Sequence, residues 1–293
     1  MAAGISAFKV AKPRAKRVPK DRQRLEALRS GVNIEDWDDH DNDANEVDIV
    51  SGVRRILRYQ WAGIPDQLNS DFKEHIVKFR NFLPSLVSRS QLYSLFSQQQ
   101  SLVDKLVAEM VSKKEIIKIV TQNARVKNDL IMTMDDYVEF LNGQIAAEKT
   151  TQHNKALLGK FKSFVLDKET DLSNAVLRGE LIKRFTIEEI KKLTELEFLS
   201  LVTSDSDRLF VIMPRFGFIV TLYLKAKTFI IRTLNATKWK EMPHKELVEK
   251  WDKNKARFKD FKGLSLLWAL HYLIGEGVIE AFETFDGNAY KVL

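Results

Sequence analysis

The spacing of apolar residues near the end of the chain predicts a helix followed directly by a two-stranded hairpin. Four apolar positions share one helical face, at i, i+4, i+7 and i+8: Leu266, Leu270, Leu273 and Ile274. Gly275 and Gly277 come next, and glycine accepts the positive φ with which many helices end. Residues 278–285 then predict a strand, Asp286-Gly287 favours a hairpin turn, and residues 289–293 predict the returning strand.

The same order of helix, strand, polar turn and strand is predicted twice more upstream, at residues 102–134 and 187–213. The three copies begin roughly 80 residues apart, and a unit repeated at a regular interval indicates tandem domains. A helix that runs into a two-stranded ribbon is typical of the end of a winged-helix module. The pattern therefore predicts a mainly helical α+β protein of three tandem winged-helix domains, at residues 46–147, 148–215 and 216–293.

Apolar positions between these copies predict further elements. Residues 72–82 predict a helix with Phe82 on its buried side, and Leu86-Val87 predicts a short strand. In the second domain, residues 171–173 predict a cap for a helix that runs through Leu177 and Leu181. In the third domain, residues 244–262 predict one lysine-rich helix.

The first 45 residues are predicted to be a disordered tail, because they hold few apolar side chains and divide into a basic and an acidic stretch. Five cations of the basic stretch are assigned to a nuclear-import signal that also tethers DNA: Lys12, Arg14, Lys16, Arg17 and Lys20. The alternative is a basic tail that is only solvated. The acidic stretch, residues 35–48, predicts a solvated linker that folds back on the basic tail. The alternative hypothesis is that its carboxylates bind a cation or a basic partner.

The amino-acid composition excludes several classes of site. The chain of 293 residues has no cysteine, which removes disulfides, thiol nucleophiles and cysteine-based zinc sites. We expect no metal site, because the five histidines are scattered without ligand spacing: His40, His75, His153, His244 and His271. No run of about 18 apolar residues is present to span a membrane, and the N-terminus lacks the apolar core of a secretory signal.

Motifs of nucleotide-binding enzymes are also missing. The sequence contains neither G-x-x-x-x-G-K-[ST] nor G-x-G-x-x-G, the loops that hold phosphates. Residues 285–287 are Phe, Asp and Gly, an order that differs from the magnesium-binding motif of kinases, and they lie at a predicted hairpin turn. We therefore expect no enzyme activity, no catalytic residue and no cofactor.

Positive charge is the feature that points to a partner. The formal net charge is +7 and the pI is ≈ 9.3, which favours a polyanion such as double-stranded DNA. Six cations lie on or beside the predicted first helix of the third domain: Arg215, Lys225, Lys227, Arg232, Lys238 and Lys240. Four apolar residues between them are predicted to hold this helix against its core: Phe218, Leu222, Phe229 and Ile230.

These six cations cannot all lie on one helical face. At 3.6 residues per turn Lys225 and Lys227 are about 200° apart. We predict that Lys225, Arg232, Lys238 and Lys240 form one stripe. Arg215 and Lys227 are also assigned to the DNA-binding site, but outside this stripe. The segment has few amide side chains for reading base edges, which favours phosphate contacts independent of DNA sequence. The alternatives are a solvated helix face and a surface that docks another protein in a nuclear complex, and the chain can be a monomer or a homodimer.

Several stretches carry a resemblance to a known family. The chain resembles the serine/threonine-protein kinase 19 family in five stretches: residues 83–84, 89–95 (Arg-Ser-Gln-Leu-Tyr-Ser-Leu), 115–120, 215–240 and 271–275. The resemblance covers roughly residues 47–293 and departs in the N-terminal tail and in a longer lysine-rich insertion. It implies three tandem winged helices that bind double-stranded DNA in the nucleus without kinase activity. It further implies a role in transcription-coupled nucleotide-excision repair, with stalled RNA polymerase II and the repair helicase factor as partners.

Overall fold

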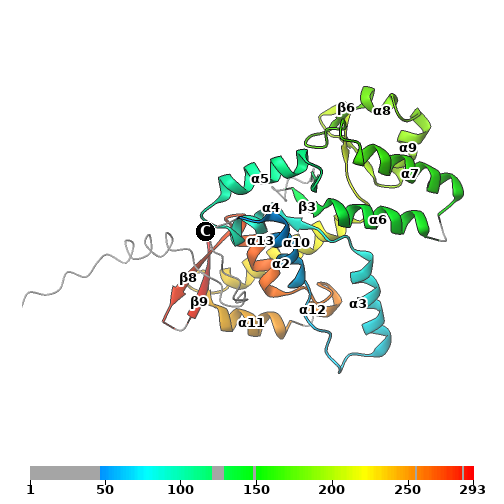
Figure 1. Ribbon diagram of the computed structural model, residues 1–293. Coiled ribbons are helices and arrows are strands. Elements are labelled where there is room, and N and C mark those ends of the chain that lie inside the picture. Colours follow the sequence, from blue (N-terminus) through cyan, green and yellow to red (C-terminus); the bar gives the residue numbers. More distant parts are fainter. Residues whose placement is uncertain (1–46, 121–128, 148–149, 255, 286) are drawn as a thin grey trace, which may run out of the picture.

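A computed structural model of the chain describes residues 47–120, 129–147, 150–254, 256–285 and 287–293. These residues form a mainly helical α+β protein with three small antiparallel sheets, one in each third of the chain (Figure 1). We call the three parts the first unit (residues 47–147), the second unit (150–213) and the third unit (214–293).

Each unit has the same order of elements: one or two helices, a short strand, further helices and a hairpin. The first unit contains α2 (Ile49–Arg58), α3 (Ser70–Phe82), β1 (Val87–Ser88), α4 (Arg89–Leu95), α5 (Gln100–Ser112), β2 (Ile116–Ile119), β3 (Leu130–Thr133) and a final helix α6 (Met134–Ala146). The second unit contains α7 (Gln152–Leu166), β4 (Val176–Leu177), α8 (Arg178–Ile182), α9 (Ile187–Glu195), β5 (Leu199–Val202) and β6 (Asp205–Val211). The third unit contains α10 (Phe216–Asn235), β7 (Glu241–Pro243), α11 (His244–Asp252), α12 (Ala256–Lys259), α13 (Leu266–Gly275), β8 (Ile279–Thr284) and β9 (Gly287–Val292).

The three sheets also share one topology. In each sheet the second hairpin strand lies in the middle, which gives the orders β1-β3-β2, β4-β6-β5 and β7-β9-β8. The outer short strands span only two or three residues, and they pair antiparallel with the middle strand. Strands this short carry no alternating apolar pattern, so β4 and β7 were not predicted from the sequence, whereas β1 and the three hairpins were.

Each hairpin is entered through the same helix end. The second residue after α5, α9 and α13 has a positive φ: Lys114 (61°), Glu197 (61°) and Gly277 (66°). The next residue then donates its N–H to a carbonyl five positions earlier: Glu115 to Met110 (2.9 Å), Phe198 to Leu193 (2.9 Å) and Val278 to Leu273 (3.0 Å). This bond is the signature of the Schellman helix end. Its presence in all three units shows a structural repeat that residue identity conceals.

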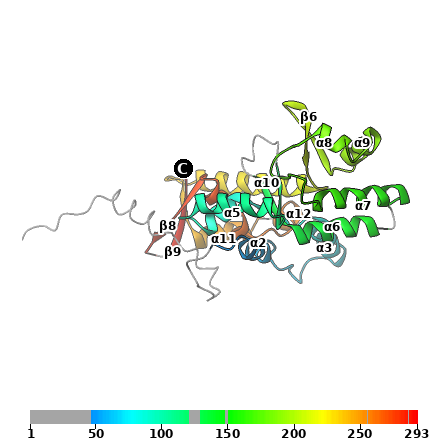
Figure 2. The same ribbon diagram turned by 45° about the horizontal axis from the view of Figure 1, so that its top comes forward.

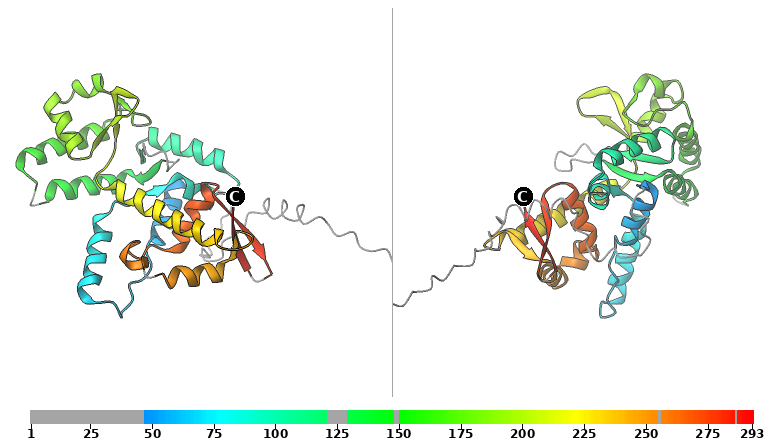
Figure 3. Two further views of the ribbon diagram at one scale, coloured as in Figure 1. Left: turned by 180° about the vertical axis from the view of Figure 1, so that it is seen from behind. Right: turned by 60° about the vertical axis from the view of Figure 1, so that its left-hand side comes forward.

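The second unit lies at one end of the molecule (Figures 1 and 3). Its core contains a cluster of four phenylalanine rings with centroids 5.5 to 6.4 Å apart: Phe161, Phe164, Phe185 and Phe198. Helices α6 and α7 run side by side and join it to the first unit (Figure 2). The hydroxyl of buried Tyr137 on α6 donates to the Ile212 carbonyl oxygen at 3.1 Å, which fastens the end of the second unit to that helix.

The first and third units share an extensive interface in which α4 packs on α13. The closest approach is at Gly275, where an added Cβ would lie 1.6 Å from the Ser90 carbonyl oxygen. The two backbones therefore meet at a position that only glycine can occupy. Residues 89–95 and 271–275, two of the stretches that carry the family resemblance, are α4 and the end of α13. The two stretches therefore lie in contact with each other in the fold.

A buried hydrogen-bond network fixes the register of this interface. The Gln91 side chain on α4 donates to the Trp268 carbonyl oxygen (2.9 Å) and accepts from the Tyr223 hydroxyl of α10 (2.6 Å). The same Gln91 oxygen accepts the Ser88 N–H at 3.0 Å, which completes a capping box at the start of α4. The Tyr223 ring stacks on Trp268 with centroids 4.3 Å apart. Three helices from two units are therefore held by one set of side chains.

His271 lies in the same interface and should make stability depend on pH. It is 4% exposed, its Nδ1 lies 2.8 Å from the Ser94 hydroxyl, and burial, with the Arg55 charge as a second cause, lowers the pKa of its imidazole to about 3. Between this folded-state pKa and the unfolded value near 6.5, only the unfolded chain binds the proton, so stability falls as pH falls. Between pH 7 and pH 5 we expect the titration of His271 to lower the free energy of unfolding by about 2 kcal/mol.

Urea unfolding at both pH values would measure this loss. The matched variant is His271→Asn, whose side chain can still bond Ser94 but does not titrate. The free energy of unfolding that this variant loses between pH 7 and pH 5 should be smaller than the parent's loss by about 2 kcal/mol. Equal losses in both proteins would show that His271 does not control the pH dependence.

Four sequence predictions about the fold were wrong in detail. Residues 171–181 contain β4 and the start of α8 instead of one helix. The polar turn before β6 is shorter than predicted, because that strand begins at Asp205. Phe82 and Phe218 are 40% and 47% exposed instead of buried. Their rings pack edge-on against each other at 6.1 Å, across the junction of α3 and α10.

The fourth correction concerns residues 244–262, which do not form one helix. Helix α11 ends at Asp252, and the chain turns through the short α12 before it reaches Phe261. The Phe261 ring stacks on Trp251 with centroids 5.0 Å apart, and Phe229 of α10 packs edge-on against Trp251. A continuous helix would carry Phe261 away from Trp251, so burial of this aromatic cluster favours the break.

Candidate nucleic-acid interface

Helix α10 has one buried and one exposed face, as its apolar spacing predicted. The buried face holds Ile219, Val220, Leu222, Tyr223, Ala226, Ile230 and Leu234. The exposed face repeats at helical spacing and holds Thr221, Lys225, Thr228 and Arg232. Lys225 and Arg232 are seven residues apart, so they lie about 10 Å apart along the helix axis on nearly the same face.

These two cations border a hollow between α10 and the α11–α12 segment. The hollow has a volume of about 420 Å³ and is lined by Thr221, Leu224, Lys225, Thr228, Phe229, Arg232, Asn254, Asp260 and Phe261. The Thr221 and Thr228 hydroxyls donate to carbonyl oxygens of their own helix, both at 2.8 Å. Phe229 and Phe261 supply apolar surface. Lys225 and Arg232 are therefore the positive charges of this lining, and Asp260 is its negative charge.

Lys238 and Lys240 continue the cationic stripe past the end of α10. Both are exposed, in the turn that leads from α10 to β7. The Lys238 ammonium lies 4.9 Å from the ring centroid of Trp239. Within the part of the chain that the structure describes, none of Lys225, Arg232, Lys238 and Lys240 forms an ion pair with a carboxylate.

Arg215, by contrast, lies at the interface between units. It precedes α10 with φ 73°, and its N–H donates to a Glu197 carboxylate oxygen at 3.2 Å. Its guanidinium lies 3.6 Å from the Phe82 ring centroid and donates to the Phe82 carbonyl oxygen at 3.3 Å. Arg215 thus connects α10 to α3 of the first unit and to the helix end of the second unit.

Lys227 is also engaged within the chain. Its ammonium lies 2.7 Å from a carboxylate oxygen of Glu276, whose side chain is only 1% exposed. The Tyr272 hydroxyl donates to the other Glu276 oxygen at 2.6 Å. A buried carboxylate needs a compensating charge, and Lys227 supplies it. Four of the six predicted cations are therefore exposed in the structure, and the other two have structural contacts within the chain.

The lysine-rich segment after α10 adds less positive charge than its composition suggests. Three of its cations are paired with carboxylates of the same segment: Lys250 with Glu246 (3.0 Å), Lys253 with Glu249 (2.9 Å) and Arg257 with Asp252 (2.8 Å). The i, i+4 spacing of the first two pairs was a signal that the sequence contained. The α10 stripe is therefore a stronger candidate for anion binding than residues 245–262.

Sequence reasoning also missed the burial of α13. This helix precedes the hairpin of the third unit, yet Trp268, Leu270 and Tyr272 are fully buried because α4 and α10 cover it. Its composition, apolar on every face, was the available signal. The equivalent helices α5 and α9 carry mixed charges on their exposed faces, including Asp104 beside Lys105 and Glu188 near Lys191.

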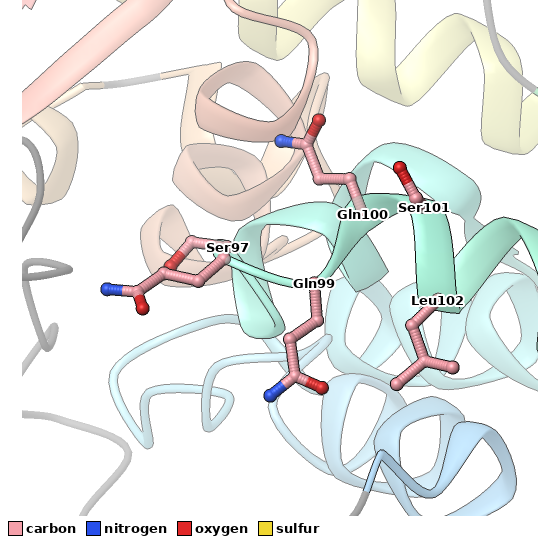
Figure 4. A pocket seen from close by; sticks show the side chains of 6 residues that line it. Ser97, Gln99, Gln100, Ser101 and Leu102 are labelled. Atoms are coloured by element: carbon pink, nitrogen blue, oxygen red, sulfur yellow. The ribbon is translucent and has the colours of Figure 1, made fainter.

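A second hollow, of about 520 Å³, lies at the start of α5 and has an uncharged lining. Its residues are Ser97, Gln98, Gln99, Gln100, Ser101 and Leu102, and the amides of Gln99 and Gln100 point in different directions (Figure 4). No group of three or more histidine, aspartate or glutamate residues that could hold a metal occurs in the described ranges. No helix among them is long and apolar enough to cross a bilayer. The predicted import signal, Lys12 to Lys20, lies outside the described residues.

Comparison with protein families gives a match over most of the chain. The model of a family described as inactive serine-threonine protein kinase 19 matches residues 58–292, which include almost all of the three units. No curated protein matches the chain.

Proposed function

The chain belongs to the inactive serine-threonine protein kinase 19 family, and from this premise we propose that it is a non-enzymatic protein that binds double-stranded DNA. Binding is largely independent of DNA sequence. The family description supports the absence of kinase activity. The missing phosphate-binding and magnesium-binding motifs support it independently.

The observation that carries this proposal is the α10 stripe of Lys225, Arg232, Lys238 and Lys240. Four exposed cations follow one another along a helix face and the turn after it, with no carboxylate partner among the described residues. Such a row matches the repeated negative charge of a DNA backbone, which releases counterions when cations neutralise its phosphates. The stripe has few amides to read base edges, so it positions the protein without selecting a sequence.

We also propose that the three units are winged-helix modules. Their common element order, sheet topology and Schellman helix ends support this assignment. In helix-turn-helix proteins the second helix of the motif enters the major groove, and the helix before the hairpin would take that place in these units. In the third unit that helix, α13, is buried against α4, so the duplex would contact the outer face of α10 instead. This arrangement favours backbone contacts over base readout.

The biological role that we propose is in transcription-coupled nucleotide-excision repair in the nucleus. The chain would link DNA, stalled RNA polymerase II and the repair helicase factor, as the family resemblance implies. The basic segment with Lys12, Arg14, Lys16, Arg17 and Lys20 would direct nuclear import. Deleting residues 1–30 from a fluorescent fusion tests this last point, and unchanged nuclear accumulation would remove the import signal from the proposal.

Charge reversal on α10 tests DNA binding. We expect Lys225→Glu with Arg232→Glu to weaken the binding of unrelated duplexes by a similar factor. Because each lost phosphate contact lowers the slope of log K against log salt by roughly 0.9, the double variant should lose about 1.8 from the parent slope. Fluorescence anisotropy at several salt concentrations measures both quantities.

The matched control makes the same change in net charge elsewhere. Lys78 of α3 and Lys168 of the second unit are exposed, and Lys78→Glu with Lys168→Glu should retain most of the affinity and the parent slope. Equal losses in the two double variants would show that net charge, and not the stripe, controls binding. A parent chain whose affinity does not change with salt would favour the alternative function, a surface that docks another protein.

A further inference from the structure

The turn between α10 and β7, residues 236–240, presents an indole ring to solvent. Trp239 is 66% exposed, whereas Trp251 and Trp268 of the same unit are 1% and 0% exposed. One exposed aromatic residue is common on protein surfaces and carries no inference by itself. Here, however, the ring lies at the end of the cationic stripe, between Lys238 and Lys240.

The contacts of Trp239 suit an anionic ligand that has an aromatic face. The Lys238 ammonium lies 4.9 Å from the indole centroid, within the range of a cation–π interaction. Because the residue is 66% exposed, much of the ring surface remains accessible for a second planar group. Protein-docking surfaces are depleted of lysine at their centres, so a tryptophan flanked by two lysines favours a nucleic acid over a protein.

Hydrogen bonds hold the turn in one conformation. Lys240 has a φ of 54°, and its N–H donates to the Thr237 carbonyl oxygen at 3.2 Å. The Val292 N–H of β9 donates to the Lys240 carbonyl oxygen at 3.1 Å. The Thr237 hydroxyl lies 2.7 Å from the Leu234 carbonyl oxygen and 3.0 Å from that of Glu241. The turn is therefore tied to α10 and to the sheet, and a ligand would not have to order it first.

We propose that Trp239 stacks on an unpaired base, which makes the α10–β7 turn a binding site for single-stranded DNA beside the duplex held by α10. Bases within an intact duplex stack on each other and offer no free face, so only an unpaired base can cover the indole. Lys238 and Lys240 would bind the phosphates on either side of that base. The inference rests on the proposed function, because Lys225 and Arg232 supply the duplex contacts.

The test compares three ligands with the full chain: a blunt duplex, the same duplex with a short single-stranded overhang, and the same overhang built from abasic residues. The abasic overhang retains the phosphates and lacks only the bases. We expect the overhang with bases to bind about tenfold more tightly than its abasic counterpart, since stacking on an aromatic side chain contributes on this scale.

Substitutions at Trp239 assign the preference to the indole. Trp239→Ala should reduce the tenfold ratio to about one, and Trp239→Phe should retain part of it, while both keep the parent affinity for the blunt duplex. Because Trp239 is exposed, neither change should affect folding, and thermal melting would check this. A fluorescent base analogue at the first unpaired position should be quenched by the parent and not by Trp239→Ala.

The outcomes separate this inference from the proposed function. If Trp239→Ala weakens all three ligands by one factor, Trp239 contacts the duplex and the stacking site is overturned, while duplex binding stands. A parent chain that does not distinguish bases from abasic residues also overturns it. If the parent fails to bind the blunt duplex but keeps a Trp239-dependent preference for bases, the duplex function is wrong and the stacking site stands.

Discussion

Replacing Gly275 by alanine is expected to destabilise the protein by about 3 kcal/mol or more, the upper range for overpacking. The added Cβ would lie 1.6 Å from the Ser90 carbonyl oxygen and 2.4 Å from its carbonyl carbon. Both atoms belong to the backbone of α4, so no side chain can rotate away to make room. Helices α4 and α13 would have to separate, which would also break the bonds that Gln91 makes to Trp268 and Tyr223.

Chemical denaturation measures this loss, and a second glycine provides the control. Gly159 lies within α7, where an added Cβ meets nothing within 4 Å. Gly159→Ala should raise stability by about 0.5 to 1 kcal/mol, because alanine is the better helix former. If Gly275→Ala were as stable as the parent, the close packing of the first and third units described here would be incorrect.

Replacing Lys227 by methionine is expected to cost about 3 kcal/mol of stability and to leave the salt dependence of DNA binding unchanged. The substitution removes the ammonium that lies 2.7 Å from Glu276 and leaves a carboxylate that is 1% exposed without its countercharge. Removal of one partner from a buried ion pair has a large effect for this reason. Adding Glu276→Gln should restore much of the loss, because the neutral amide needs no countercharge.

The matched control is Lys225→Met, two residues away on the opposite face of the same helix. Lys225 is exposed, so this change should leave stability nearly unaltered and lower the salt slope by roughly 0.9. The two variants therefore separate a structural lysine from a ligand-binding lysine by two independent measurements. If Lys227→Met lowered the slope as Lys225→Met does, Lys227 would belong to the DNA face after all.

Together, these contacts show that the first and third units share a buried interface, whereas tandem domains would each have a separate core. Tyr223 of α10, Trp268 of α13 and Gln91 of α4 form one buried cluster although they lie far apart in sequence. Arg215 adds a joint between α10, α3 and the second unit. The exposed face of α10 is therefore supported on its inner side by residues from more than one unit. Such support keeps a row of cations in a fixed geometry.

The three helix-and-hairpin segments followed from the sequence because the relevant signals are local. Apolar spacing located the helices before each hairpin, Gly277 marked one helix end, and Gly287, with a φ of 101°, marked the start of a returning strand. Local signals also identified the two faces of α10 and so predicted the stripe of Lys225 and Arg232. Hydrogen bonds and side-chain contacts within a helix or a hairpin join residues close in sequence, so their pattern is visible without the fold.

Tertiary structure alone decided what covers each apolar face and which charges remain available. Apolar spacing predicted one buried face of α13, but only the fold shows that α4 covers the helix further and that Gly275 permits the contact. Lys225 and Lys227 are equivalent in composition, yet Glu276, forty-nine residues from Lys227 along the chain, pairs with one of them and not the other. The electrostatic role of a lysine depends on its distance to carboxylates and on its solvation. Both quantities are set by residues remote in sequence, which no local pattern contains.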